Sequence, residues 1–355
     1  MANLHFSRNT KVFLKQGAHV WEIPVLDGFS FSQATNASEI TLNEMSNSAG
    51  VSRRARQMFT DSYAPAEWSF SSYARPNNGS VVEEALWANF VAANTYSGTA
   101  WANGVEVAGA TTTFDFDSSN TTILGTFDLY FVMGACGHAD DNFVAADGLS
   151  IYKIADCVAN EAGIDFDIDG IATINWSGFG KIISEEAAFD ASGAIDRFTT
   201  STSNFIRNRL TSLSLSRTGG ATYDVVLTGG NITFTNNITF LTPETLCTVN
   251  QPLGHVTGTR SISGSFTCYL NTTGDSSAEL FEDLIEDVNT VTNSHALSFS
   301  IGGTSTPKLV VSMPTCHLEV PTHSIEDVIS LETNFHALPS TIDGTDEATI
   351  AYTGA

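Results

Sequence analysis

The sequence has little charge, and very little of that charge is positive. Charged residues make up 15% of the 355 residues, below the roughly 25% of an average soluble domain. Lys and Arg number 15 against 39 Asp and Glu, so the formal net charge is −24. A protein that binds nucleic acid through its phosphates needs a basic surface. The composition therefore argues against a nucleic-acid-binding protein.

Cysteines are few, and long apolar runs are missing. The five cysteines are widely spaced and include no CxxC pair, which argues against a zinc site or a redox motif. We expect free, mostly buried thiols in a reducing cytoplasm. The N-terminal residues lack the apolar core of a signal peptide, and the longest apolar run, near 129–136, is too short to span a membrane.

Signatures of catalysis are also missing. The chain contains no HExxH motif, no GxSxG motif and no glycine-rich phosphate loop. Residues 165–170 imitate the start of an EF-hand calcium loop, but the twelfth position holds Trp176 where a bidentate acid is required. We therefore expect a protein that is not an enzyme and that has no catalytic residues, no metal and no cofactor.

The sequence does contain many short alternating segments, rich in Thr, Ser, Asn and Gly. Ile164, Phe166 and Ile168 alternate with three aspartates, and residues 297–301 alternate before a Gly-Gly turn. This period of two predicts β-strands, so the fold class is mainly β. Two segments instead show helical spacing, residues 81–94 and 277–289, with Ser80 and Ser277 as expected N-caps and Glu83 completing a capping box.

The two predicted helices lie in matching surroundings, which indicates an internal duplication. Phe70 and Phe266, in the strand before each helix, are 196 positions apart, and Glu161 and Glu319 are 158 apart, as are Asp169 and Asp327. Repeats on this scale are architectural. We predict a first domain at 1–190 and a second at 191–355, with about 37 extra residues of the first copy in an insertion at 95–150.

Three segments give the chain a resemblance to a known family. They are residues 23–36 (IPVLDGFSFSQATN), 161–178 (EAGIDFDIDGIATINWSG) and 263–271 (SGSFTCYLN). With their spacing they cover most of the chain, which resembles the tail tube proteins of long-tailed bacteriophages of the siphophage type. The resemblance implies β-sandwich or partial-barrel domains, each with one flanking α-helix. It also implies the branch with a duplicated tube domain, in which three chains build a ring of six domains.

The same resemblance implies a structural role. The subunits would self-assemble into stacked rings around an acidic channel, through which DNA passes without specific binding. The partners would be further copies of the chain, a tape-measure protein and other tail proteins, with no membrane involved. The protein would belong to the virion tail and assemble in the host cytoplasm. The insertion at 95–150 has no counterpart in the second copy, and an outward-facing position is one option for it.

Two groups of residues are candidates for this role. Acidic residues on strands with an apolar opposite face are expected to line the channel, although the outer face stays open as an alternative; they are Asp165, Asp167, Asp169 and Asp327. Basic residues in the predicted long loop at 42–67, and in its second-copy counterpart at 243–260, are expected either to contact a neighbouring ring or to be solvated. They are Arg53, Arg54, Arg56 and Arg260.

A different class of protein shares the Thr- and Asn-rich strands. A β-sandwich that binds carbohydrate or decorates a capsid would present exposed aromatic platforms. Trp87, Trp101 and Trp176 are the available candidates.

Overall fold

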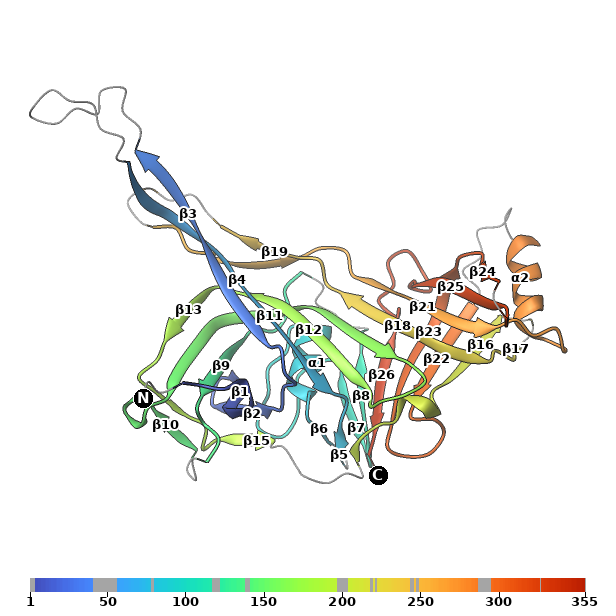
Figure 1. Ribbon diagram of the computed structural model, residues 1–355, viewed down its shortest axis with the longest axis horizontal. Helices are drawn as coiled ribbons and strands as arrows, with labels where there is room; N and C mark the ends of the chain where they lie inside the picture. Colours follow the sequence, from blue (N-terminus) through green and yellow to red (C-terminus); the bar gives the residue numbers. More distant parts are fainter. Residues whose placement is uncertain are drawn as a thin grey trace, which may run out of the picture.

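Alternation of apolar and polar side chains drives most of this chain into antiparallel strands. A computed structural model describes residues 4–40, 56–77, 80–116, 122–137, 141–196, 204–217, 220, 222–242, 246, 249–286, 295–325 and 327–354. The described part is mainly β, with two α-helices, and the mainly β prediction is confirmed (Figure 1). Its helices are too short and insufficiently apolar to cross a membrane.

One long antiparallel sheet runs through both halves of the chain (Figure 1). In spatial order its strands are β3 (Ser30–Ile40), β4 (Gln57–Tyr73), β12 (Thr173–Gly180), β11 (Ser150–Phe166), β18 (Leu227–Thr235), β21 (Ser261–Tyr269) and β25 (Ser330–Ala337). The halves meet where β11 pairs with β18, with Ile164 opposite Ile232. Backbone hydrogen bonds therefore continue across the junction without a break.

Further strands cover the apolar side of this sheet. In the first half they are β1 (Thr10–Gln16), β2 (His19–Ile23), β9 (Phe127–Met133), β13 (Ile182–Glu185) and β15 (Ala194–Asp196), which pairs in parallel with β2. In the second half they are β16 (Ser212–Arg217), β17 (Thr222–Tyr223), β22 (His295–Ile301), β23 (Lys308–Leu318), β24 (Thr322–Ser324) and β26 (Thr349–Thr353).

The stretch at 95–150 is built into the fold rather than being wholly outward-facing. It contributes β7 (Val105–Ala108) and β8 (Thr111–Asp115), and β8 pairs with β26 near the end of the chain. Phe114 on β8 and Phe131 on β9 are fully buried. These strands form part of the hydrophobic core. The structure therefore differs from the option that the insertion faces outward. Small two-stranded sheets are formed by β5 (Pro76–Asn77) with β6 (Ser80–Val81), β10 (Asn142–Val144) with β14 (Ala188–Asp190), and β19 (Ile238–Leu241) with β20 (Gly254–Thr257).

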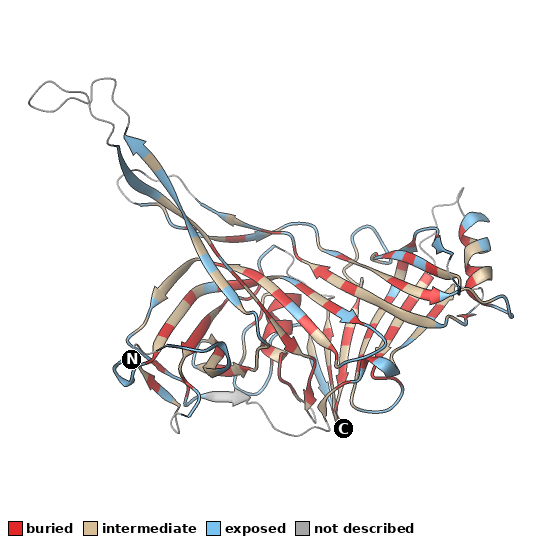
Figure 2. Ribbon diagram, viewed as in Figure 1, coloured by how far each residue is buried: buried red, intermediate tan, exposed pale blue. Residues whose placement is uncertain are grey.

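The two helices form near their predicted places but occupy different environments. Helix α1 (Glu84–Val91) is enclosed, because all its residues after Glu84 are buried, and Trp87 packs against Trp176 with ring centroids 4.7 Å apart. Helix α2 (Ser277–Glu286) lies at the periphery and buries Leu280 and Leu284 (Figure 2). The expected flanking position therefore fits α2, whereas α1 lies inside the protein. Among the described residues, 3-10 turns are formed by η1 (Ser7–Asn9), η2 (Ala145–Asp147) and η4 (Asn208–Leu210).

Neither helix has the cap that the sequence predicts. Ser80 lies in β6, and Glu83, at the N-cap of α1, is buried and accepts a hydrogen bond from the backbone N–H of Arg75 at 3.5 Å. The Ser277 hydroxyl donates to the carbonyl of Tyr269 at 3.0 Å and accepts from the N–H of Asn271 at 2.8 Å. Tertiary contacts thus use the side chains that local capping rules assign to the helix ends.

Candidate functional site

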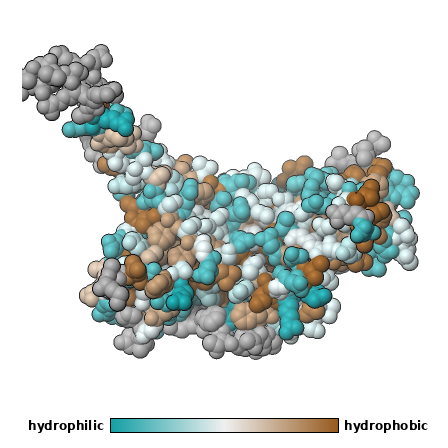
Figure 3. All heavy atoms as spheres, in the orientation of Figure 1, coloured by the Kyte–Doolittle hydropathy of each residue, from teal (hydrophilic) through white to brown (hydrophobic). Residues whose placement is uncertain are grey.

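The long sheet has one buried face and one open, hydroxyl-rich face, which we call the polar face. Three rows of aligned residues cross it from β3 or β4 to β21 or β25. They are Ser30, Ser69, Ser177, Glu161, Thr235 and Ser261; Ser71, Asn175, Gly163, Thr233, Ser263 and His336; and Tyr73, Thr173, Asp165, Asn231, Ser265 and Asn334. These rows contain neither Lys nor Arg. The middle of the surface seen in Figure 3 is correspondingly mainly teal and white.

Amide side chains hold the carboxylates of the polar face in place. Asn175 donates to Asp165 at 2.8 Å, and Ser71 in turn donates to Asn175 at 2.7 Å. Near the other edge, Asn334 donates to Glu319 at 2.8 Å. This hydrogen bond, together with His336, lowers the pKa of Glu319 below its usual value. Glu319 therefore keeps its negative charge further into acidic solution than an ordinary glutamate does.

The predicted acidic residues divide between this face and its rim. Asp165 lies on β11 and faces outward between the buried Ile164 and Phe166, as the alternation predicts. Beyond Phe166 the strand ends, and Ile168, which should have been buried, is 47% exposed. Asp167 and Asp169 therefore lie in the bend that leads to β12, where an Asp169 carboxylate oxygen is 3.6 Å from Arg209. Asp327 lies exposed in the bend before β25.

The two described basic residues among those predicted, Arg56 and Arg260, lie in different surroundings. Arg56, at the start of β4, is largely exposed and lies 3.4 Å from Glu39. Arg53 and Arg54 fall outside the described residues. The Arg260 guanidinium is half-buried: it pairs with Glu347, donates to the carbonyl of Thr345 at 3.2 Å, and lies over the ring of Phe116 at 5.0 Å. Its described contacts are therefore within the chain.

Two hairpins project from one end of the long sheet, where the sequence predicts long loops. Strand β4 already begins at Gln57, and pairing with β3 continues out to Ile40, so the stretch 42–67 is largely strand in its described part (Figure 1). The β19–β20 hairpin runs beside it, and the N–H of Tyr63 donates to the carbonyl of Asn250 at 3.0 Å. We call these the two arms. Apart from Met58 and Phe59, two large apolar residues in a polar stretch, the sequence gives no sign of these arms.

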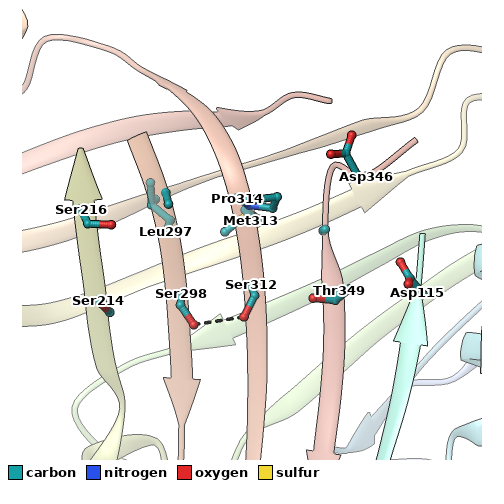
Figure 4. A pocket seen from close by; sticks show the side chains of 12 residues that line it. Asp115, Ser214, Ser216, Leu297, Ser298, Ser312, Met313, Pro314, Asp346 and Thr349 are labelled. Carbon is teal, nitrogen blue, oxygen red and sulfur yellow. Dashed lines mark hydrogen bonds between the residues drawn. The ribbon is translucent and has the colours of Figure 1, made fainter. Parts of the chain in front are cut away.

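A hollow lined mainly by second-half strands does not resemble a catalytic centre. It measures about 370 Å³ and lies over β16, β22, β23, β26 and β8 (Figure 4). Small hydroxyl side chains dominate its lining, with Ser298 and Ser312 3.2 Å apart and two acids, Asp115 and Asp346. No His, Lys or Arg lies among its lining residues, so the hollow lacks the Ser–His or Ser–Lys pair that commonly activates a serine.

Thiols and metal ligands offer no alternative chemistry in the described part of the chain. Burial raises the pKa of Cys268 to about 11 and that of Cys316 to about 12, so both thiols stay protonated and unreactive. Cys157 is buried as well, whereas Cys136 is exposed, and all four are free. The described residues include no group of three His, Cys, Asp or Glu side chains that could hold a metal ion.

The aromatic platform that a carbohydrate-binding protein would need is not formed by the expected residues. Trp87 and Trp176 are fully buried in the core, and Trp101 is buried with its indole N–H donated to Glu84 at 2.5 Å. Sugar rings stack on exposed aromatic faces, which these three side chains do not offer. The expectation that they could serve as platforms is therefore wrong.

Comparison with known proteins gives one informative relative. The chain is 30% identical to the tail tube protein pb6 of Escherichia phage T5 over 374 aligned residues, which cover 99% of this chain and 76% of the T5 protein. No protein-family model matches the chain.

Proposed function

The chain belongs to the bacteriophage tail tube proteins, and from this we propose that its polar face lines the channel of a tube built from stacked rings. As a tail tube protein it is a structural component of the virion tail rather than an enzyme. The observation that carries the proposal is the polar face itself. It crosses both halves of the chain without a break and holds carboxylates, hydroxyls and amides, with no Lys or Arg in its three rows.

Such a surface suits the passage of DNA without specific binding. Duplex DNA carries one negative charge per roughly 1.7 Å, so Lys or Arg on the wall would hold it at many points. Repulsion by carboxylates is screened over about 8 Å at physiological salt, but it persists in a narrow channel. Asp165 would lie on the wall of this channel, and Asp167, Asp169 and Asp327 would lie at its rim.

We further propose that the chain contains two tandem tube domains, 1–190 and 191–355. The strand order β3-β4-β12-β11 is followed by β18-β21-β25-β23 in the same direction across the fold. Phe70 pairs with Trp176, and the repeat partner Phe266 pairs with Thr333. Glu161 aligns with Ser177, and its partner Glu319 donates its N–H to Asn334 at 2.9 Å. At the offset of 158 these pairings correspond to within one residue, which supports a duplication, and both halves share one hydrophobic core.

Three such chains would close a ring of six domains. Inside the chain, β11 of the first half pairs with β18 of the second half, and this pairing is a template for the contact between chains. The outer edge of β3 pairs with no described strand, so this edge can make such a contact with another chain. An open edge of this kind is a hazard in a monomer and a productive contact in an assembly. The loop with Arg53, Arg54 and Arg56 would contact the next ring. A tape-measure protein and other tail proteins would be further partners, with assembly in the host cytoplasm.

Electron cryomicroscopy of assembled tubes tests this proposal. The expected map has threefold symmetry, six similar domains in each ring, and the polar face on the inner wall. A ring of six whole chains would contradict the tandem-domain proposal. A map with the polar face on the outside would contradict the channel assignment.

A further inference from the structure

The two helices occupy equivalent places in the two halves of the chain. Helix α1 is tied to the end of β1, where the side-chain amide of Gln16 donates to Asn89 at 2.9 Å. Helix α2 is tied to the end of β16, where Arg217 lies 3.5 Å from Asp283. Gln16 and Arg217 are the last residues of their strands and lie 217 − 16 = 201 positions apart. The surroundings of α1 therefore indicate what should surround α2.

Helix α1 owes part of its enclosure to the second half of the chain. Trp87 packs against Phe234 of β18 with ring centroids 5.6 Å apart, and its indole N–H donates to Tyr352 of β26. The side-chain amide of Asn236, just after β18, donates to the carbonyl of Phe90 at 3.1 Å. The half that follows along the sheet thus covers the helix of the half before it.

Helix α2 carries less cover at the same positions. The helices align at an offset of 195, one less than the strands before them, so Leu86 and Phe90 correspond to Phe281 and Ile285. Leu86 and Phe90 are fully buried. By contrast, Phe281 is half-buried and Ile285 is 48% exposed. Two apolar positions that are covered in the first half are therefore open in the second.

Further apolar side chains are exposed next to α2. The ring of Phe281 lies edge-on to His323 of β24, with centroids 4.8 Å apart. In the bend that follows β24, Ile325 is 79% exposed and Val328 is 58% exposed. Helix α2 lies at the outer end of the second half (Figure 1), and apolar residues gather at this end of the molecule (Figure 3). Exposed apolar surface that is concentrated on one feature marks an interaction site.

We propose that α2 of one copy packs on the first half of the next copy in the same ring, which covers it as the second half of the chain covers α1. At the offset of 201, Asn236 corresponds to Thr35, which is exposed on β3. Ile285 would therefore lie beside Thr35 of the next copy. The Thr35 hydroxyl would donate to the carbonyl of Ile285, in place of the Asn236 amide. This inference rests on the proposed tube function and names a surface that closes the ring.

Cysteine cross-linking in assembled tubes tests this contact. The T35C/I285C variant, in a background with Cys136 and Cys247 changed to serine, is treated with a short bismaleimide and run on a denaturing gel. A contact within a ring of three links each copy to two neighbours, so bands of two and three chains are expected, and none from either single variant. No cross-linked product in intact tubes, or an open-ended ladder, would overturn the inference. A ladder that ends at six chains would support the contact but contradict the proposed ring of three.

A charged substitution gives an independent test if the cysteines disturb assembly. The I285E variant should keep the wild-type melting temperature, because Ile285 is exposed in the single chain, but it should lose rings and tubes in electron micrographs. The matched control is V107E, since Val107 is 53% exposed on β7, and this variant should form tubes normally. Normal tubes from I285E would refute the role of α2. Failure of the wild-type chain to form rings would instead count against the proposed function.

Discussion

The indole N–H of Trp87 donates a hydrogen bond to the Tyr352 hydroxyl at 2.8 Å, joining residues 265 positions apart. Trp87 lies on the enclosed helix α1, and Tyr352 lies on β26, the last strand. Both side chains are buried, so the bond is shielded from water. It fastens the end of the chain to the helix that follows β4, and thus helps to make one body of the two halves.

Changing Tyr352 to Phe should lower the free energy of unfolding by about 1–3 kcal/mol, because the Trp87 N–H would then be buried without its partner. Denaturant titration followed by tryptophan fluorescence measures this loss. Tyr269 is exposed and serves as the matched control, so Y269F should leave the stability unchanged. Equal stability of Y352F and the wild type would show that the bond contributes nothing.

Changing Leu284 to Ala should cost about 2–5 kcal/mol, because Leu284 is one of the side chains that α2 buries against the body of the protein. The adjacent Ile285 is 48% exposed and provides the control, since I285A changes the same helix at a solvent-facing position. Thermal melting of both variants compares them. A melting temperature of L284A equal to that of I285A would contradict the packing of this helix.

Acidification should destabilise the contact between the β19–β20 hairpin and residue 124. The Nε2 of His255 accepts a hydrogen bond from the Leu124 N–H at 3.0 Å, and burial lowers the pKa of His255 from its usual 6.5. The unfolded chain therefore takes up this proton more readily than the fold does. The free energy of unfolding should decrease as the pH falls below about 6.5, until His255 is protonated in the fold as well.

The H255N variant tests this pH dependence, because an amide cannot take up the proton. Unfolding free energies of H255N and the wild type are compared between pH 7.5 and 5. The difference between the two proteins should shrink as the pH falls. The H323N variant, altered at an exposed histidine, should show the wild-type dependence, and a constant difference between H255N and the wild type would exclude His255 as the cause.

Reversing the charge on the polar face should slow the passage of DNA. Phage carrying D165K should assemble tubes, since Asp165 is exposed, but should eject DNA more slowly, most strongly at low salt where screening is weakest. A second phage with D167K, D169K and D327K tests the rim. D165N separates the loss of negative charge from the gain of positive charge. Unchanged DNA ejection by D165K phage with intact tubes would contradict the assignment of the polar face to the channel.

Changing Arg53, Arg54 and Arg56 to Glu should block tube growth without unfolding the subunit, because exposed charges contribute little to stability. The same three positions changed to Lys keep the positive charge and form the control. Tube formation is followed by electron microscopy and folding by circular dichroism. Tubes of normal length from the Glu variant would show that this loop does not take part in the contact between rings.

Local patterns in the sequence predict the strands well and the ends of elements poorly. The alternation around Asp165 places Ile164 and Phe166 inward, but it gives no warning that the strand stops before Ile168. The predicted helix at 81–94 is shorter in the structure, at Glu84–Val91. Its N-terminal turn lies in the interior, where Glu83 binds the backbone of Arg75 and a local cap does not form.

The sequence by itself determines the β-rich class, the acidic charge, the existence of both helices and the polar character of one face of each strand. It does so because side chains alternate across a strand and repeat every 3.6 residues in a helix. Only the tertiary structure decides that β11 pairs with β18, that β8 from the insertion pairs with β26, and that Arg260 meets Glu347. The backbone hydrogen bonds of a sheet are nearly the same for any sequence, so the choice of neighbouring strands comes from how distant apolar faces pack together.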